Sequence, residues 1–155
     1  METIFQISPF PSFEDIRVPL AFLILGPVFF FYALKNKTMK KRKFGLFWGA
    51  TATLMACFLL YAVASKHYNV HKKFAKGEFE MISGEIEVLR VQPKDGHTEG
   101  DLISVGGIKF EIDHFLVTPC YNKTIKNGGA LKHGTEVNLF VSENCILRVE
   151  RKRES

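Results

Sequence analysis

Two long apolar stretches, separated by a short basic one, dominate the pattern of the first half of the chain. Residues 18–34 and 44–65 contain no charged side chain and are 17 and 22 residues long. Because a helix rises about 1.5 Å per residue, about 20 apolar residues cross the hydrocarbon core of a bilayer. The second stretch exceeds that length, and the first is at its lower limit. The pattern therefore predicts a hairpin of two transmembrane helices.

The nine residues between the apolar stretches contain six basic side chains: Lys35, Lys37, Lys40, Lys41, Arg42 and Lys43. Short loops rich in Lys and Arg stay on the cytoplasmic side of a membrane. Residues 66–76 contain four more lysines and compete with this signal, but at a lower density. We therefore expect the loop 35–43 to face the cytoplasm and both chain termini to lie outside it.

Small side chains recur every four residues along the second apolar stretch, at Gly45, Gly49, Thr53 and Cys57. Such a stripe lets another helix backbone approach closely. The nearest partner is the first helix of the same chain, and a homodimer is the alternative. Pro27, near the middle of the first helix, predicts a kink there because proline removes a backbone donor.

From residue 77 onward the pattern changes to short segments in which apolar and polar residues alternate. Ile108, Phe110 and Ile112 alternate with charged residues, which is typical of a strand with one buried face. Five or six such strands, separated by glycine-containing turns, fit into the 79 residues from 77 to 155. Because an open sheet leaves strand edges unpaired, we expect a closed, barrel-like module of the OB or SH3 type. The expected core consists of Ile86, Val88, Ile108, Phe110, Ile112, Val137, Leu139, Val141, Ile146 and Val149.

These patterns divide the chain into three parts and predict an α+β membrane protein. Residues 1–17 form an external N-terminal segment, 18–76 the helix hairpin with a helical extension, and 77–155 a small β domain. The start of the chain is acidic and lacks the small-residue cleavage site of a secretory signal. We therefore expect the first helix to be retained, in a multi-pass protein of the inner membrane.

Charge is distributed unevenly between the two halves. The net charge of +5 combines +8 for residues 1–76 with −3 for residues 77–155. The positive charge thus belongs to the membrane part, and we expect no nucleic-acid partner. Of the three cysteines, Cys57 lies in the second apolar stretch, whereas Cys120 and Cys145 lie in the β domain. Outside the cytoplasm these two can form a disulfide.

The C-terminal half resembles a family of small, largely uncharacterised bacterial proteins that have a membrane anchor and a C-terminal β domain. The resemblance covers about half the chain and implies a shared fold without an established chemistry. The layout is also similar, more weakly, to the membrane-tethered OB modules of NfeD-type proteins. The matching residues are Gly77-Glu78-Phe79-Glu80, Ser83-Gly84, Pro93, Gly96-His97, Glu99, Val105-Gly106-Gly107-Ile108-Lys109-Phe110, Gly128-Gly129, Gly134, Val137, Asn144 and Ile146-Leu147-Arg148-Val149-Glu150.

No catalytic or metal-binding motif accompanies this pattern. His67 and His71 share a helix face, but a third metal ligand is not evident nearby. Asp113 and His114 are adjacent, so on a strand they would point to opposite faces. We therefore expect no enzyme, cofactor or metal, and predict a non-enzymatic module that binds an envelope protein or peptide. The alternative is a small ligand-binding protein or hydrolase-like enzyme that uses loop residues of the β domain: His97, Glu99 and His114.

Overall fold

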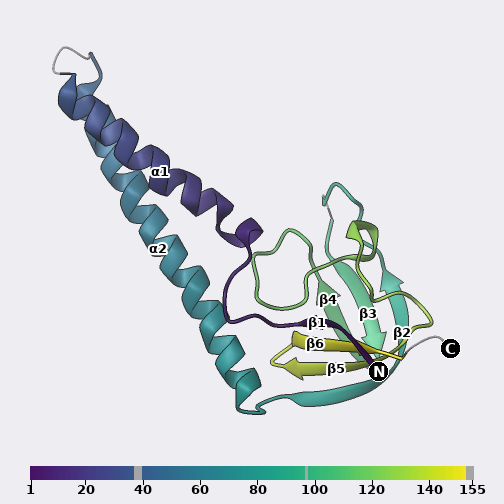
Figure 1. The fold of residues 1–155 in the computed structure, drawn as a ribbon. Coiled ribbons are helices and arrows are strands. Elements are labelled where there is room, and N and C mark those ends of the chain that lie inside the picture. The colour runs from purple at the N-terminus through teal and green to yellow at the C-terminus, as the bar shows by residue number, and fades with distance from the viewer. Residues whose placement is uncertain (37–39, 97, 153–155) are drawn as a thin grey trace. The chain divides into compact units, whose positions relative to one another are not determined.

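A computed structural model describes residues 1–36, 40–96 and 98–152 of the chain (Figure 1). It contains two long helices and one six-stranded antiparallel sheet, which confirms the predicted α+β class. The chain divides into two compact units. The helical unit is Phe10–Tyr68, and the β unit combines Met1–Pro9 with Asn69–Ser155. The elements in chain order are β1 (Glu2–Gln6), α1 (Phe13–Lys35), α2 (Arg42–Ala75), β2 (Glu80–Arg90), β3 (Asp101–Val105), β4 (Ile108–Ile112), the 3₁₀ turn η1 (Ile125–Asn127), β5 (Glu136–Ser142) and β6 (Cys145–Arg151).

Helix α1 begins five residues before the apolar stretch, at a reciprocal cap. The Ser12 hydroxyl accepts a hydrogen bond from the Asp15 backbone N–H at 3.4 Å, and the Asp15 carboxylate accepts one from the Ser12 backbone N–H at 3.0 Å. This capping box satisfies backbone donors that have no partner inside the helix. Two acidic side chains in the first turn also complement the positive end of the helix dipole. Glu14 and Asp15, which lie outside the predicted apolar stretch, thus form the first turn of the helix.

Helices α1 and α2 run antiparallel within the helical unit (Figure 1). At the end near the connection, the Arg42 Nε donates a hydrogen bond to the Ala33 carbonyl at 3.1 Å. At the other end, the His67 Nε2 lies 3.7 Å from the Asp15 carboxylate. Both helices are long and apolar enough to cross a membrane.

The sheet has the strand order β1-β6-β5-β2-β3-β4, and its longest strand, β2, joins two parts of it. The first half of β2 pairs with β5 from Glu80 to Glu85, and the second half pairs with β3 from Ile86 to Arg90. Gly84 lies beside this change of partner. A Cβ atom on Gly84 would stand 3.1 Å from the backbone nitrogen of Gly106, so the β3–β4 turn approaches β2 closely there.

The hydrophobic core lies between the two parts of the sheet. Eight of the expected core residues are buried: Ile86, Phe110, Ile112, Val137, Leu139, Val141, Ile146 and Val149. Val88 is only partly buried, and Ile108 is 44% exposed because it begins β4 at the end of the sheet. The prediction was therefore wrong for Ile108. Ile103, Val105, Tyr121 and Leu131 complete the cluster.

The predicted closed barrel is wrong, because β1 and β4 are the two edges of an open sheet. Both edge strands are only five residues long, and β4 carries Lys109 and Glu111, so the edges are short and charged as in natural open sheets. Strand β1 lies in the predicted external segment 1–17, for which no strand was predicted. It pairs with β6, which is more than 140 residues away, and a partner that distant cannot be predicted from a local pattern.

This pairing predicts that the N-terminus stabilises the C-terminal sheet. Ile7, just after β1, is 3% exposed, and its N–H bonds to the Leu147 carbonyl at 2.8 Å. Ile7→Ala in the full chain should lower the free energy of unfolding of the β unit by about 2–5 kcal/mol, because it empties a buried site. The exposed Met1→Ala should change it by less than about 0.5 kcal/mol. Near-ultraviolet circular dichroism during thermal unfolding measures both, and equal melting of the two variants would contradict the role of β1.

Candidate functional site

The two helix backbones touch where Gly26 of α1 faces Gly49 of α2. A Cβ atom on Gly49 would lie 2.7 Å from the Gly26 carbonyl oxygen, and one on Gly26 would lie 3.0 Å from the Gly49 carbonyl oxygen. Neither side can therefore accept a side chain without separating the helices. The Thr53 hydroxyl donates to the Gly49 carbonyl at 2.7 Å, which satisfies this hydroxyl inside an apolar helix. The predicted small-residue face is thus used within the chain, against α1.

The predicted stripe follows this contact only along part of its length. Gly45 and Gly49 are buried and Thr53 is half-buried, but Cys57 is exposed and Ala56 is buried in its place. Successive residues are about 100° apart around a helix, so Cys57, twelve residues after Gly45, points about 120° away from it. Ala56, eleven residues after Gly45, points only about 20° away from it and therefore lies at the contact. Cys57 was therefore wrongly assigned to the packing face.

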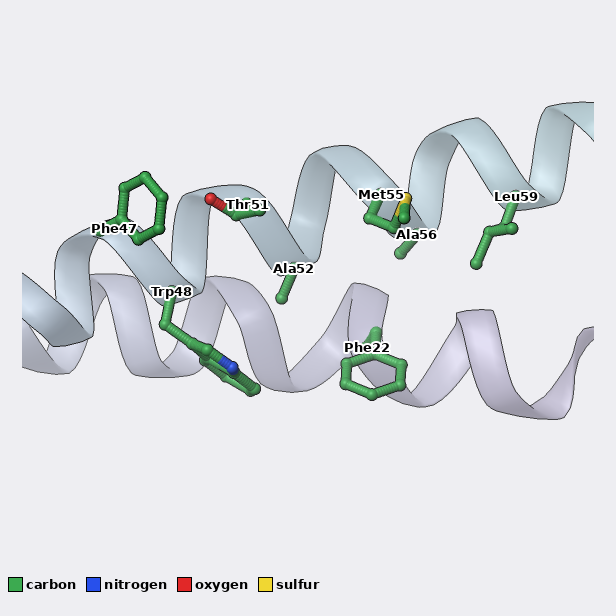
Figure 2. A pocket seen from close by; sticks show the side chains of 8 residues that line it. All are labelled: Phe22, Phe47, Trp48, Thr51, Ala52, Met55, Ala56 and Leu59. Atoms are coloured by element: carbon green, nitrogen blue, oxygen red, sulfur yellow. The ribbon is translucent and has the colours of Figure 1, made fainter.

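Aromatic side chains extend the contact beside an apolar pocket of about 280 Å³. The Trp48 ring lies 5.1 Å from the Phe29 ring and 6.4 Å from the Phe22 ring, measured between centroids. Figure 2 shows Trp48 reaching from α2 across α1, with Met55 and Leu59 farther along α2. The pocket offers apolar surface and almost no polar group that could orient a reacting molecule, so it suits lipid chains or an apolar helix.

The basic residues of the predicted cytoplasmic loop gather at the connected end of the helix pair. Lys35, Lys40, Lys41 and Lys43 are exposed there, and Lys37 lies outside the described residues. Arg42 is half-buried, since its guanidinium caps the carbonyl of Ala33 at the end of α1. Positive side chains at a helix C-terminus also offset its dipole.

The β unit carries a surface groove of about 600 Å³ at one end of its core. Its walls are the start of β2, the start of β4 and the β5–β6 turn. We call it the acidic groove, after the carboxylates of Glu78, Glu80 and Glu143. Its lining residues are Gly77, Glu78, Phe79, Glu80, Ile82, Ile108, Phe110, Val141, Ser142, Glu143 and Asn144. An open groove lined by both apolar and acidic groups can hold an extended segment of another chain.

The rim of the acidic groove is held by contacts within the β unit. The Lys73 ammonium lies 2.8 Å from the Glu143 carboxylate, and this hydrogen bond lowers the pKa of the Glu143 carboxyl. Glu143 and Asn144 have φ angles of 50° and 64°, which fit the tight hairpin turn between β5 and β6. Phe79 packs between Phe74 and Phe140, each 5.4 Å away between ring centroids. The groove is therefore built on an ordered turn and an aromatic stack.

The loop residues of the alternative hypothesis have structural contacts. Glu99 pairs with Arg90, whose guanidinium also lies 2.9 Å from the Glu111 carboxylate. The His114 ring packs against Phe115, and His97 lies outside the described residues. Within residues 1–36, 40–96 and 98–152, no cluster of His, Cys, Asp or Glu side chains could hold a metal ion.

A buried polar network, which the sequence analysis missed, organises the loops on either side of the β3–β4 hairpin. The Asp101 side chain is almost fully buried, and it accepts hydrogen bonds from the backbone N–H groups of Gln92 and Ile125, each at 2.6 Å. The Gln92 amide in turn donates to the Asp113 carboxylate at 3.0 Å. A buried carboxylate is tolerated when such bonds replace its water. The available signal was an acidic residue at the start of a strand whose other residues, apart from Ser104, are apolar.

Cys120 and Cys145 are joined by a disulfide, with their Cα atoms 5.2 Å apart. It closes a loop of 25 residues, which stabilises a fold by about 3–4 kcal/mol through the unfolded chain. Next to it, the Tyr121 hydroxyl accepts a hydrogen bond from the Ala130 N–H at 2.8 Å, and burial raises the pKa of this phenol. The loop after β4 is thereby fastened to the start of β6.

Comparisons of the chain with protein-family models, with curated proteins and with solved structures find no match.

The glycine contact generates a prediction with an internal control. Gly49→Leu should separate α1 from α2 and cost on the order of 1–3 kcal/mol, because a side chain cannot fit between the backbones. Cys57→Leu, on the same predicted stripe but exposed, should leave stability unchanged. Thermal unfolding of the detergent-solubilised chain measures both. If the two variants melt alike, the glycine contact does not hold the helices together.

Proposed function

We propose that this protein is a membrane-anchored, non-enzymatic interaction module of the bacterial cell envelope. One observation carries the proposal: the same chain combines two membrane-length apolar helices with a small sheet that has open edges and an acidic groove. Its helices anchor the chain in the inner membrane, and its β unit binds a protein or peptide partner. The bacterial source rests on the resemblance of the C-terminal half to anchored bacterial β domains.

The proposed orientation places the connected end of the helix pair in the cytoplasm and the β unit outside it. The exposed lysines at that end, Lys35, Lys40, Lys41 and Lys43, support this orientation because short basic loops stay inside. The Cys120–Cys145 disulfide supports it independently. Disulfides persist in the periplasm or outside the cell and are rare in the cytosol. Both chain termini then lie on the extracytoplasmic side.

The proposed binding surface is the acidic groove together with the neighbouring edge strand β4. In the described part of the chain β4 pairs only with β3, so its outer edge, although short and charged, is open to a short partner strand. Main-chain pairing at such an edge binds extended peptides, and neighbouring pockets select side chains. Ile108 at the mouth of the groove is 44% exposed and offers an apolar contact. The carboxylate of Glu80 favours a segment that carries a basic residue, whereas Glu78 and Glu143 already lie 3.5 Å from Lys76 and 2.8 Å from Lys73.

The alternative, a ligand-binding protein or hydrolase-like enzyme built on the loops, has less support. Glu99 and His114 are engaged with Arg90 and Phe115 respectively. An activated acid or base would instead need a partner that tunes it within reach of a substrate. The two candidates differ in what should copurify with the solubilised chain: a stoichiometric protein or a bound small molecule.

The orientation predicts the activity of two fusion proteins. Alkaline phosphatase fused after Ser155 should be active, because it folds only where its disulfides form. The same enzyme fused after Thr38 should be inactive, because it would remain in the cytoplasm. Activity assays in intact bacteria, normalised to fusion abundance, measure the two. The reverse pattern would contradict the orientation.

The binding surface predicts a site-specific cross-link. A photoreactive phenylalanine analogue at Ile108 should capture a defined protein partner in living cells. The same analogue at Leu89, which has nearly the same exposure at 43% but lies outside the groove, should not. Mass spectrometry of the cross-linked bands identifies the captured protein. Equal capture at both positions, or none at Ile108, would contradict a partner in the acidic groove.

A further inference from the structure

An exposed apolar loop lies between β4 and the disulfide. Three consecutive side chains in it are largely exposed: Phe115 by 56%, Leu116 by 57% and Val117 by 47%. Exposed apolar clusters of this kind mark contacts with partners or membranes. We name residues 115–117 the apolar loop.

The apolar loop is held in shape by bonds at both of its ends. The Asp113 carboxylate accepts a hydrogen bond from the Phe115 N–H at 3.0 Å, and the Asn122 amide donates to the Leu116 carbonyl at 3.3 Å. Cys120 then ties the following residues to β6. These contacts keep the backbone in place while the side chains stay in contact with solvent. Folding of the β unit alone therefore does not bury them.

The loop is fastened to the end of the β unit from which the chain leaves for both apolar helices. Cys145, at the start of β6, holds Cys120. Leu147, two residues later, accepts the hydrogen bond from Ile7, just before the chain continues to α1. Glu143, in the turn before β6, binds Lys73 on the last turns of α2. Both chain connections and Cys120, three residues after the apolar loop, thus meet at the β5–β6 turn and the first residues of β6.

The lengths of these connections limit how far that end can lie from the apolar stretches. Phe13, the first residue of α1, follows Ile7 by six positions, and an extended chain of that length reaches about 20 Å at most. On the other side, Lys73 lies eight helical residues beyond the apolar stretch that ends at residue 65, or about 12 Å. A surface on this end is therefore within reach of lipid headgroups.

We propose that the apolar loop inserts into the outer leaflet of the bilayer and holds the β unit against the membrane surface. The occupant of this surface is lipid: the side chains of 115–117 enter the region between headgroups and acyl chains. The exposed Lys123, next to Asn122 at the base of the loop, lies where it can meet anionic headgroups. This inference rests on the proposed membrane anchoring. It adds a second attachment, which restricts how the acidic groove is presented.

Tryptophan fluorescence of the full chain in liposomes of phosphatidylcholine and phosphatidylglycerol tests the proposal. Trp48, the single tryptophan of the wild-type chain, reports whether the helices are in the bilayer. In the Trp48→Phe background, Leu116→Trp places the probe in the loop. Met81→Trp places it on β2, at a site that is 60% exposed and outside the loop. Val117→Trp is the second loop variant, in case Leu116→Trp disturbs folding.

We expect lipids with brominated acyl chains to quench Trp48 in the wild type and tryptophan at position 116 or 117, but not at position 81. The loop tryptophans should also emit at shorter wavelength than the one at position 81. Quenching of Trp48 without quenching of the loop tryptophans would overturn the insertion while leaving the anchor intact, and would point to a protein partner for the loop. Equal quenching at positions 81 and 116 would overturn it as well. Absence of quenching at Trp48 would refute the membrane anchoring and the insertion together.

Discussion

The β unit depends on the way strand β2 changes partners along its length. Its first half completes the part of the sheet that contains β5 and β6, and its second half begins the part that contains β3 and β4. Because one strand belongs to both parts, the core side chains of each part face the other across a single bend. Gly84 permits the close approach of the β3–β4 turn at this point. The acidic groove lies before this bend, at the start of β2.

Strand β6 contacts two segments that are distant in the sequence, the N-terminal strand and the loop after β4. Its first residues hold the disulfide and the hydrogen bond to Ile7, and its length pairs with β1 from the opposite end of the sequence. In the sequence, the helical unit is therefore inserted between the first strand of the β unit and its other five strands. Such long-range pairing is slow to form because the chain must close a large loop first. Both connections to the helices then emerge near the same turn.

The helical unit is built on a different principle, the direct contact of two backbones. Apolar side chains gain little from contacting each other when lipid surrounds them, so close packing and small residues decide the association. Gly26 and Gly49 provide that approach, and Trp48 packs across α1 beside it. Together with the exposed apolar loop, these features support the proposed function, in which the protein holds a binding surface at a membrane.

The local elements could be predicted from the sequence, because each depends on residues close together in the chain. Charge-free stretches predicted both helices, and alternation around Ile108, Phe110 and Ile112 predicted a strand with one buried face. Eight of the expected core residues are buried for the same reason. The basic loop was visible as composition, but its consequence for orientation stays a prediction.

Which segments meet could not be predicted from local patterns, because strand pairing depends on partners that are distant in the sequence. Strand β1 is recognisable only beside β6, and the open sheet follows from which edges remain when all strands have paired. The buried Asp101 is stable only because two remote backbone N–H groups converge on it. Ala56, and not the predicted Cys57, is buried at the helix contact. The reason is that an α-helix has about 3.6 residues per turn, so residues spaced by four gradually rotate away from the partner helix.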